Sequence, residues 1–391
     1  SKTLNPLSEK LVAKRRAGAN LIDLTQTNPT CCELFVTGPE ALEALTAREN
    51  IAYEPHPKGL LEARLAVVDY YAAKGIAVDS ENIFLTSGTS EAYSFVFKLL
   101  TDPHTSVLAP KPGYPLFDFL GDLHDIKIQN YPLRFDAGGW GVDEAALSEL
   151  LTGAPPRALL AVHPNNPTGH YLSARQRHRL RELSAETAVP LVVDEVFFDY
   201  ALEPVAQIQS FAEDGPALTF TLSGISKILC LPQMKLSWVV VGGPPSLVAE
   251  AVGRLEVISD TYLSAATPIQ RALPVWMRSR AKVQSAVISR IRDNFDLLRK
   301  VFQGHPVIEV LPCQAGWVAV LKICLSKEAA ARFDDESLAI ELLEKTNVVV
   351  HPGYFYDFTD GPHWVLSLLL KPEAFECGIR AVDTFLTNFA L

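Results

Sequence analysis

From about residue 82 to residue 242 the sequence alternates short apolar runs with longer amphipathic stretches. The apolar runs are NIFLTSG (82–88), SVLAP (106–110), ALLAVHP (158–164), PLVVDEVF (190–197), ALTFTLSG (217–224) and SWVVVGG (237–243). Stretches between them, such as SARQRHRLRELSAETA (173–188), have the periodicity of a helix. Strands that are apolar nearly throughout and alternate with helices predict a mostly parallel sheet covered on both faces.

After residue 243 the pattern becomes long and helical, and a mixed segment follows. Its candidate strands are GWVAVLKI (316–323), NVVVHPG (347–353) and HWVLSLLL (363–370). A chain of 391 residues is too long for one ordinary core, so we expect two domains. We predict an α/β fold with a large cofactor-binding domain at 46–275 and a smaller α+β domain. The smaller domain would combine an N-terminal segment at 1–45 with the C-terminal residues 276–391.

Charge, hydropathy and cysteine usage exclude several classes of partner. The formal net charge of −10 and the pI of about 5.4 disfavour nucleic acid and anionic membranes, which need a basic surface. No apolar run is long enough to span a membrane, and SKTLNPLSEKLVAKRRAG at the N-terminus contains no apolar signal core. The cysteines follow no metal-binding spacing, so we expect reduced thiols, no metal site and a cytoplasmic location. They are Cys31, Cys32, Cys230, Cys313, Cys324 and Cys377.

Ligands of such sheets bind beyond the carboxyl ends of the strands, so the residues just after each run matter most. TSGTSEA follows the first run, and its Ser87, Gly88 and Thr89 could offer N–H groups and hydroxyls to a phosphate. An ordinary helix cap is the commoner use of such residues. KPGYPLF follows the second run and contains Tyr114, which is either a flat face for a ligand or a core tyrosine.

The next three strand ends carry an amide, a carboxylate and an amine. HPNNPTG holds Asn166 in a proline turn, and VVDEVFFDY places Asp194 directly after an apolar strand. A carboxylate leaving a buried strand needs a partner, which can be a helix cap, an arginine or a cationic ligand. TLSGISK then places Lys227 between small hydroxyl residues and an apolar segment, where a lysine is costly to bury.

Taken together, these strand-end residues fit the chemistry of pyridoxal 5'-phosphate. A lysine amine joins the aldehyde of this cofactor as a Schiff base, and a carboxylate keeps its pyridine nitrogen protonated. An aromatic ring stacks on the cofactor, and small-residue N–H groups bind its phosphate. Lys227, once displaced by substrate, is then the natural base to move the substrate Cα proton.

These motifs resemble those of the class I and II aminotransferases, the fold-type I pyridoxal-phosphate enzymes that include aspartate aminotransferase. The resemblance runs from LIDLTQTNPT (21–30) to the C-terminus and covers YEPHPKG, TSGTSEA, PGYP, NNPTG, DEV, SGISK and VVVHPGYFYDF. It implies that Lys227 forms the Schiff base and that Asp194 pairs with the pyridine nitrogen. It also implies that Asn166 donates to the phenolic oxygen of the cofactor and that Tyr114 stacks on the ring.

The resemblance further implies a phosphate site and a homodimer. Residues in the family's phosphate-binding positions are Ser87, Gly88, Thr89, Ser223 and Ser226. Tyr53 is similar to the tyrosine that reaches the phosphate from the neighbouring subunit, which implies that two copies of the chain share their sites.

Four positions depart from the family pattern. Phe197 stands where a tyrosine is usual in the family. Because no phenol then stabilises the oxyanion of the cofactor, we predict a raised pKa for the imine between Lys227 and the cofactor. Lys235 replaces an arginine that binds the phosphate and offers fewer directed donors. Thr27 replaces a glycine of the N-terminal motif, and Val365 replaces the arginine that holds the substrate α-carboxylate.

The leading hypothesis is therefore an aminotransferase that moves an amino group from an amino donor to a keto acceptor with ping-pong kinetics. Val365 and Phe197 keep a second hypothesis open, a β-elimination or racemisation with the same cofactor, because a fold does not determine the reaction. A third hypothesis is a non-catalytic sensor of the cofactor or of an amine. Lys227 aligned with Asp194 argues against the sensor, since binding alone requires no base beside an electron acceptor.

Overall fold

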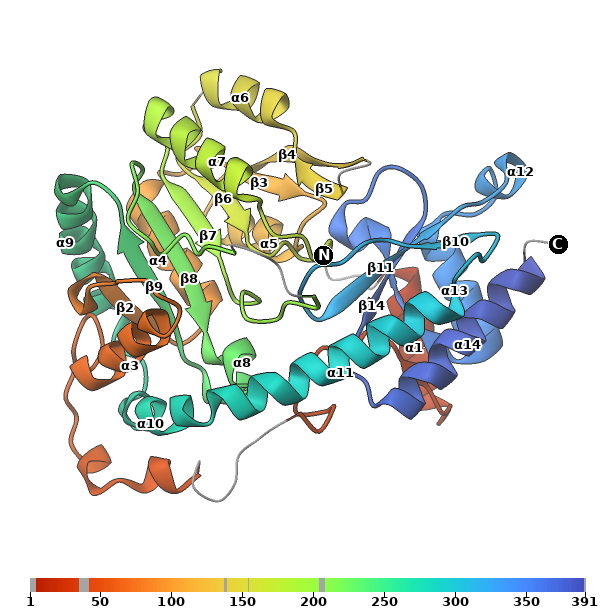
Figure 1. The fold of residues 1–391 in the computed structure, drawn as a ribbon, viewed down its shortest axis with the longest axis horizontal. Helices are drawn as coiled ribbons and strands as arrows, with labels where there is room; N and C mark the ends of the chain where they lie inside the picture. The colour runs from red at the N-terminus through yellow and green to blue at the C-terminus, as the bar shows by residue number, and fades with distance from the viewer. Residues whose placement is uncertain (1–4, 35–41, 137–138, 154, 204–207, 390–391) are drawn as a thin grey trace.

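Residues 5–34, 42–136, 139–153, 155–203 and 208–389 are described by the computed structural model of the chain. They form a larger part around an eight-stranded sheet, on the left of Figure 1, and a smaller part on the right. α11 (Arg280–Val301) extends from the helices beside the large sheet to the smaller part. This arrangement confirms the predicted α/β fold with a smaller α+β part.

The large sheet has the strand order β2-β9-β8-β7-β6-β3-β4-β5. Its strands are β2 (Ile83–Thr86), β3 (Ser106–Lys111), β4 (Lys127–Asp136), β5 (Gly139–Val142), β6 (Leu159–Val162), β7 (Leu191–Asp194), β8 (Thr219–Gly224) and β9 (Ser237–Gly242). The neighbours from β8 to β4 are parallel. β9 is antiparallel to both β8 and β2, and β5 is antiparallel to β4.

Helices cover both faces of the large sheet because successive strand residues point to opposite sides. The helices are α3 (Leu61–Ala72), α4 (Thr89–Leu100), α5 (Leu116–Leu123), α6 (Glu144–Thr152), α7 (Ala174–Thr187), α9 (Pro245–Tyr262) and α10 (Thr267–Arg278). Val192 and Phe220 belong to the core formed with α4, α5 and α9. Leu191 and Val193 face the other way, into the core formed with α6 and α7. α3 and α10 form a separate core with β2 and β9.

The smaller part contains two sheets and the terminal helices. Its antiparallel sheet, in the order β10-β11-β14-β13, consists of β10 (Ile308–Val310), β11 (Val318–Ile323), β14 (His363–Ser367) and β13 (His351–Pro352). β1 (Ile22–Asp23) pairs in parallel with β12 (Val348–Val349). The helices are α1 (Pro6–Arg16), α12 (Lys327–Ala330), α13 (Asp335–Thr346) and α14 (Pro372–Phe389).

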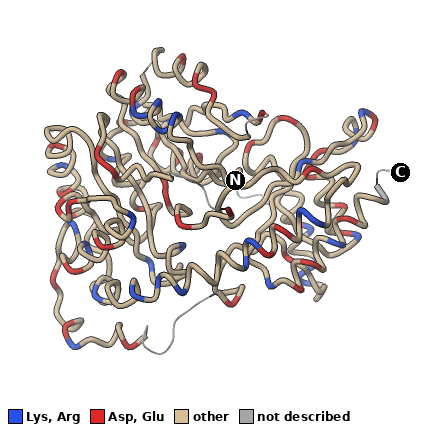
Figure 2. The backbone as a smooth tube through the Cα atoms, viewed as in Figure 1, with Lys and Arg blue, Asp and Glu red and all other residues tan. Residues whose placement is uncertain are grey.

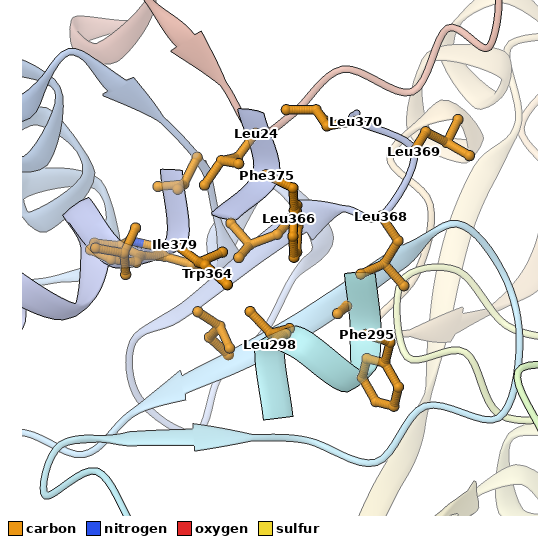
Figure 3. Packing of buried hydrophobic residues seen from close by; sticks show 14 of the residues in the cluster. Leu24, Phe295, Leu298, Trp364, Leu366, Leu368, Leu369, Leu370, Phe375 and Ile379 are labelled. Atoms are coloured by element: carbon orange, nitrogen blue, oxygen red, sulfur yellow. The ribbon is translucent and has the colours of Figure 1, made fainter. Parts of the chain in front are cut away.

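Residues near the N-terminus lie in the core of this smaller part. Leu24 packs among Leu366, Phe375 and Ile379 (Figure 3). The N–H of Ser367 donates to the carbonyl of Leu24 at 2.6 Å. A Cβ at Gly378 would lie 2.7 Å from Leu24 Cδ2, so glycine allows α14 to approach the N-terminal segment closely. Segments from both ends of the chain therefore build the smaller part, as the sequence predicted.

Short helical turns complete the described structure. They are η1 (Ala44–Thr46), η2 (Arg48–Ile51), η3 (Ser80–Asn82), α8 (Ile225–Ile228), η4 (Pro232–Met234) and η5 (Gly353–Tyr356). The predicted domain boundary at 45/46 falls inside η1, and the one at 275/276 falls inside α10. These boundaries stay predictions.

Charged residues of both signs are distributed over both parts of the molecule (Figure 2). Among the helices in the described ranges, none combines the length and the apolar character needed to cross a bilayer. The same ranges contain no group of three or more His, Cys, Asp or Glu residues that could hold a metal ion. All six cysteines are free thiols.

Candidate active site

The strand ends of the large sheet gather the predicted residues at one edge. β2 runs in the direction of β8, because both are antiparallel to β9, and β3, β6 and β7 are parallel to β8. These five strands therefore all end at the same edge. The segments that leave it are 87–89, 112–114, 163–166, 195–197 and 225–227. β9 begins at this edge, two residues after Lys235.

Asp194 is the last residue of β7 and is bound by two donors. Its Oδ1 accepts from the N–H of Val196 at 2.9 Å, and its Oδ2 accepts from the hydroxyl of Tyr93 at 3.1 Å. Burial raises the pKa of the Asp194 carboxyl to about 6, although these donors and the charge of Lys227 lower it. A carboxyl in this setting favours a cationic partner.

Lys227 lies in α8, immediately after β8. Gly224 pairs with Ser237 at this turn, and a Cβ at 224 would lie 2.2 Å from Ser237 Oγ, so only glycine lets the two strands approach. Burial lowers the pKa of the Lys227 amine, while the charges of Cys230 and Asp194 raise it. The lowered pKa increases the fraction of neutral amine, which is the nucleophilic form.

Aromatic rings surround the amine of Lys227. Its Nζ lies 5.4 Å from the ring centroid of Phe197 and 5.0 Å from that of Trp317. The rings of Phe197 and Trp317 meet edge to face with centroids 5.4 Å apart. Tyr200 packs edge to face on Trp317 at 5.1 Å, and its hydroxyl donates to the carbonyl of Lys227. Trp317 precedes β11, so the smaller part contributes to this site.

The predicted phosphate-binding residues include the start of α4. Gly88 is the N-cap of α4, and a Cβ built on it would meet nothing within 4 Å, so this helix end faces open space. Thr89 is half-buried at the first helical position. Ser87 is exposed, and its N–H already donates to Glu91 Oε2 at 2.6 Å.

The remaining phosphate candidates flank β8 and β9. The Ser223 hydroxyl is buried and donates to the carbonyl of Glu195 at 3.5 Å. Ser226 is half-buried beside Lys227. Lys235 is exposed and occupies the left-handed region at a φ of 53°. All of these residues lie at the same edge as Asp194, and their binding of a phosphate stays a prediction.

Tyr114 and Asn166 follow β3 and β6. Tyr114 is 43% exposed, which leaves its ring available at the site. Burial raises the pKa of the Tyr114 phenol, and the charge of Asp194 raises it further. Asn166 is half-buried, next to Asn165, whose amide donates to the Thr168 hydroxyl at 2.8 Å.

Three further positions singled out in the sequence are Tyr53, Thr27 and Val365. Tyr53 is 74% exposed, and its segment is tied to Ser264 through His56. Thr27 is exposed. Val365 is 1% exposed in an apolar cluster that includes Leu311, Val320, Tyr356 and Phe358. A valine side chain carries no charge, so position 365 provides no cation for a substrate carboxylate.

Sequence reasoning missed three residues of this site, Tyr93, Tyr200 and Trp317, and the buried Glu195 next to Asp194. Tyr93 lies one helical turn beyond Thr89 in α4. Helical periodicity counted from the TSGTSEA motif could have identified it. Burial raises the pKa of Glu195 to about 7, although Ser210 Oγ and the N–H of Phe211 donate to its carboxylate. Trp317 has no signal in the sequence, because it reaches the site from the other part of the molecule.

Comparisons with known proteins identify the family to which the chain is similar. The sequence model of the family "Aminotransferase class I and II" matches residues 19–365. Human tyrosine aminotransferase is 24% identical over 386 residues, which cover 95% of this chain and 82% of that protein. An S-alkyl-thiohydroximate lyase from Arabidopsis thaliana is 27% identical over 383 residues, which cover 95% of this chain and 81% of the lyase.

Solved structures show the same fold. An alanine aminotransferase from Pyrococcus furiosus matches with a TM-score of 0.88 at 19% identity, over 98% of this chain and 96% of that chain. The family match spans most of the sequence, and the members of this family depend on pyridoxal phosphate. The chain therefore belongs to the class I and II aminotransferases.

Proposed function

We propose that Lys227 and Asp194 are the catalytic residues of this pyridoxal-phosphate-dependent aminotransferase. The enzyme transfers an amino group between an amino acid and a keto acid. The observation that carries the residue assignment is the placement of the two side chains. They leave the neighbouring strands β7 and β8 at one edge, and each shifts the pKa of the other towards the charged form.

The donor set at this edge fits the cofactor. A carboxylate of raised pKa suits a pyridinium nitrogen, and the N-terminus of α4 with its hydroxyls suits a phosphate. We assign the cofactor contacts to Ser87, Gly88, Thr89, Tyr114, Asn166, Asp194, Phe197, Ser223, Ser226, Lys227, Lys235 and the partner's Tyr53. Of these, Ser87 must exchange its bond to Glu91 before its N–H can reach a phosphate.

Bound pyridoxal phosphate supplies an aldehyde for a lysine amine and a protonated ring that accepts electrons from the substrate Cα. Lys227 would supply that amine, and its Nζ, when free, would hold and move the Cα proton of the substrate. Burial assists this role because it keeps part of the amine neutral. Asp194, oriented by Tyr93 and the Val196 N–H, ionises beside a cation because an opposite charge lowers its pKa.

The buried apolar surroundings of Val365 bear on the substrate. An amino acid bound at this site finds no cation at position 365, so its carboxylate must be held by a different residue. This distinguishes the chain from the family pattern at the point where donor and acceptor are selected.

A β-elimination is the second candidate reaction. It is supported by the apolar cluster around Val365, and by the lyase from Arabidopsis thaliana to which the chain is 27% identical. The two reactions share Lys227 and Asp194 and differ in what happens after the Cα proton has left. Their products distinguish them, because elimination releases ammonia and transamination leaves the nitrogen on the cofactor.

We further propose that the chain forms a homodimer through a surface next to Tyr53. Ile51 is 87% exposed and Leu263 is 65% exposed, and single chains rarely leave such large apolar side chains in water together. The segments that carry them are adjacent, because the Ser264 hydroxyl bonds both the N–H and the carbonyl of His56. We propose the cytoplasm as the location, supported by the free thiols of all six cysteines.

The decisive experiment identifies the lysine that the cofactor modifies. The loaded protein is expected to have a long-wavelength absorbance that borohydride removes, and peptide mapping is expected to place the reduced adduct on Lys227. Lys227→Ala should abolish the adduct and keep the fold. Lys322→Ala, at a surface ion pair with Asp360, is the matched control and should retain the adduct.

A reducible adduct on another lysine, or its persistence in Lys227→Ala, would refute the assignment. A panel of amino acids added to the loaded wild-type protein then identifies the reaction. Loss of the long-wavelength band with formation of the pyridoxamine form supports transamination, whereas ammonia release supports elimination. If no amine changed the spectrum, the result would favour a non-catalytic sensor and would contradict both transamination and β-elimination.

A further inference from the structure

We propose that Trp317 is a positioning residue for Lys227, holding the ammonium form of its side chain against the face of the indole ring. This inference rests on the proposed function, in which Lys227 is the reactive lysine. It assigns a role in that site to a residue of the smaller part, which the sequence motifs do not identify.

The contacts around the amine carry the proposal. Lys227 Nζ lies 5.0 Å from the ring centroid of Trp317 and 5.4 Å from that of Phe197, within the range in which aromatic rings attract a cation. Trp317 is buried and Lys227 is largely so, and the attraction strengthens when water is excluded. The edge-to-face contact of the two rings fixes one against the other.

Trp317 is held in place by the same loop that binds the backbone of Lys227. The N–H of Gly316 donates to the carbonyl of Tyr200 at 2.9 Å, and the hydroxyl of Tyr200 donates to the carbonyl of Lys227. On the other side, the N–H of Leu368 donates to the carbonyl of Trp317 at 2.8 Å. These bonds hold the backbone on both sides of Trp317 and the carbonyl of Lys227 in one connected unit, so the fold sets the position of the indole ring relative to Lys227.

The charged and titratable groups that act on the amine come from other elements. Asp194 at the end of β7 and Cys230 beyond α8 both favour its charged form, and burial opposes them. The Tyr200 hydroxyl donates to the carbonyl of Lys227, the Tyr93 hydroxyl donates to Asp194, and the charge of Asp194 raises the pKa of Tyr114. Because Phe197 and Tyr200 also pack on Trp317, the test compares two substitutions of residue 317 that differ in whether they retain a ring.

The test compares Trp317→Phe with Trp317→Leu in the cofactor-free protein. The two variants leave similar space, but only phenylalanine presents a ring face to the amine. The rate at which an acylating reagent labels Lys227, measured by mass spectrometry across pH, gives the pKa of the amine. We expect the pKa to be lower in the leucine variant by about 0.5 to 1.5 units, which makes Lys227 about threefold to thirtyfold more reactive at neutral pH.

Trp364→Phe and Trp364→Leu are the matched controls. Trp364 is buried in the same part of the molecule, and its indole N–H donates to the carbonyl of Asp335, away from the amine. The two Trp364 variants should give the same titration of Lys227. An equal pKa in both Trp317 variants, or an equal difference in the Trp364 pair, would overturn the proposal.

Folding of the variants is checked by circular dichroism. Trp317→Phe removes an indole N–H that is buried without a partner among the described residues, so this variant is expected to fold. If Trp317→Leu does not fold, Trp317→Met replaces it, because methionine adapts to irregular space. The labelling requires neither cofactor nor turnover, so the role of Trp317 is judged even if the adduct experiment assigns the cofactor to another lysine.

Discussion

Two adjacent carboxyls at the end of β7 illustrate how the fold treats individual residues. Burial raises the pKa of Asp194 to about 6 and that of Glu195 to about 7. Glu195 is satisfied within the protein by Ser210 and the N–H of Phe211, whereas Asp194 faces the candidate site. The sequence identified Asp194 from its place after an apolar run. The sequence could not predict that Glu195 is buried and bonded within the protein, because its hydrogen-bond donors come from a loop that is distant in the sequence.

Asp194→Asn is expected to stabilise the cofactor-free protein at neutral pH. The raised pKa means that the folded state retains a proton which the unfolded chain loses above about 3.8, so stability falls as pH rises from about 4 to 6. Above pH 6 the buried carboxyl is ionised, and the folded state has lost up to about 3 kcal/mol of stability. Denaturant unfolding measures the free energy of unfolding at pH 4 and pH 8, and the difference between the two values should be smaller for the variant than for the wild type. A variant less stable than the wild type at pH 8 would contradict this account.

Phe197→Tyr is expected to lower the pKa of the lysine-bound cofactor. A phenol at this position can donate to the cofactor oxyanion, which favours loss of the proton from the link by on the order of one pH unit. Phe197 is only half-buried beside Trp317, so a hydroxyl has access to the site. Titration of the long-wavelength absorbance in both proteins measures the effect, and an unmoved midpoint would refute it.

At the level of elements, the apolar runs identified the strands that are buried on both faces. β2, β6, β7, β8 and β9 fall within the runs predicted from the sequence, and β3 extends one residue beyond its run, to Lys111. The hairpin of β4 and β5 was not predicted, because β4 is a partly exposed strand of mixed composition without a continuous apolar run. The antiparallel direction of β9 could not be predicted either, because an apolar run does not indicate the direction of its strand in the sheet.

Gly224→Ala is expected to lower the free energy of unfolding by about 1–3 kcal/mol. The added Cβ would lie 2.2 Å from Ser237 Oγ and 2.8 Å from Ser237 Cβ, at the turn that positions Lys227. Ser237→Gly in the same chain should restore most of the loss. Gly253→Ala is the matched control in α9, where a Cβ meets nothing and alanine should stabilise by up to about 1 kcal/mol. Urea midpoints compare the four proteins, and equal stability of Gly224→Ala and wild type would refute the packing argument.

At the scale of the whole molecule, the site depends on segments far apart in the sequence. Asp194 and Lys227 were predictable because they belong to one continuous series of strand ends. The contribution of Trp317 was not, because it follows from how the smaller part packs against the larger one. In the proposed homodimer, the exposed apolar surface around Ile51 and Leu263 would make the site depend on a second copy of the chain as well.

Ile51→Asp combined with Leu263→Asp is expected to convert the proposed dimer into a monomer. Two charges in an apolar interface lose their hydration without gaining partners. Light scattering coupled to size-exclusion chromatography should show half of the wild-type mass. Phe119→Asp is the control, since Phe119 is 65% exposed on α5, outside this surface. An unchanged mass in the double variant, or a monomeric wild type, would refute the proposed interface.

The backbone bonds between residues 200–202 and 314–316 constrain how this enzyme can open. Gly316 N–H to Tyr200, Leu202 N–H to Gln314 and the Ala201–Ala315 bridge join the two parts beside Lys227. A movement that opened this seam would break these backbone links and carry Trp317 away from Lys227, so we expect the seam to stay closed when the two parts move against each other.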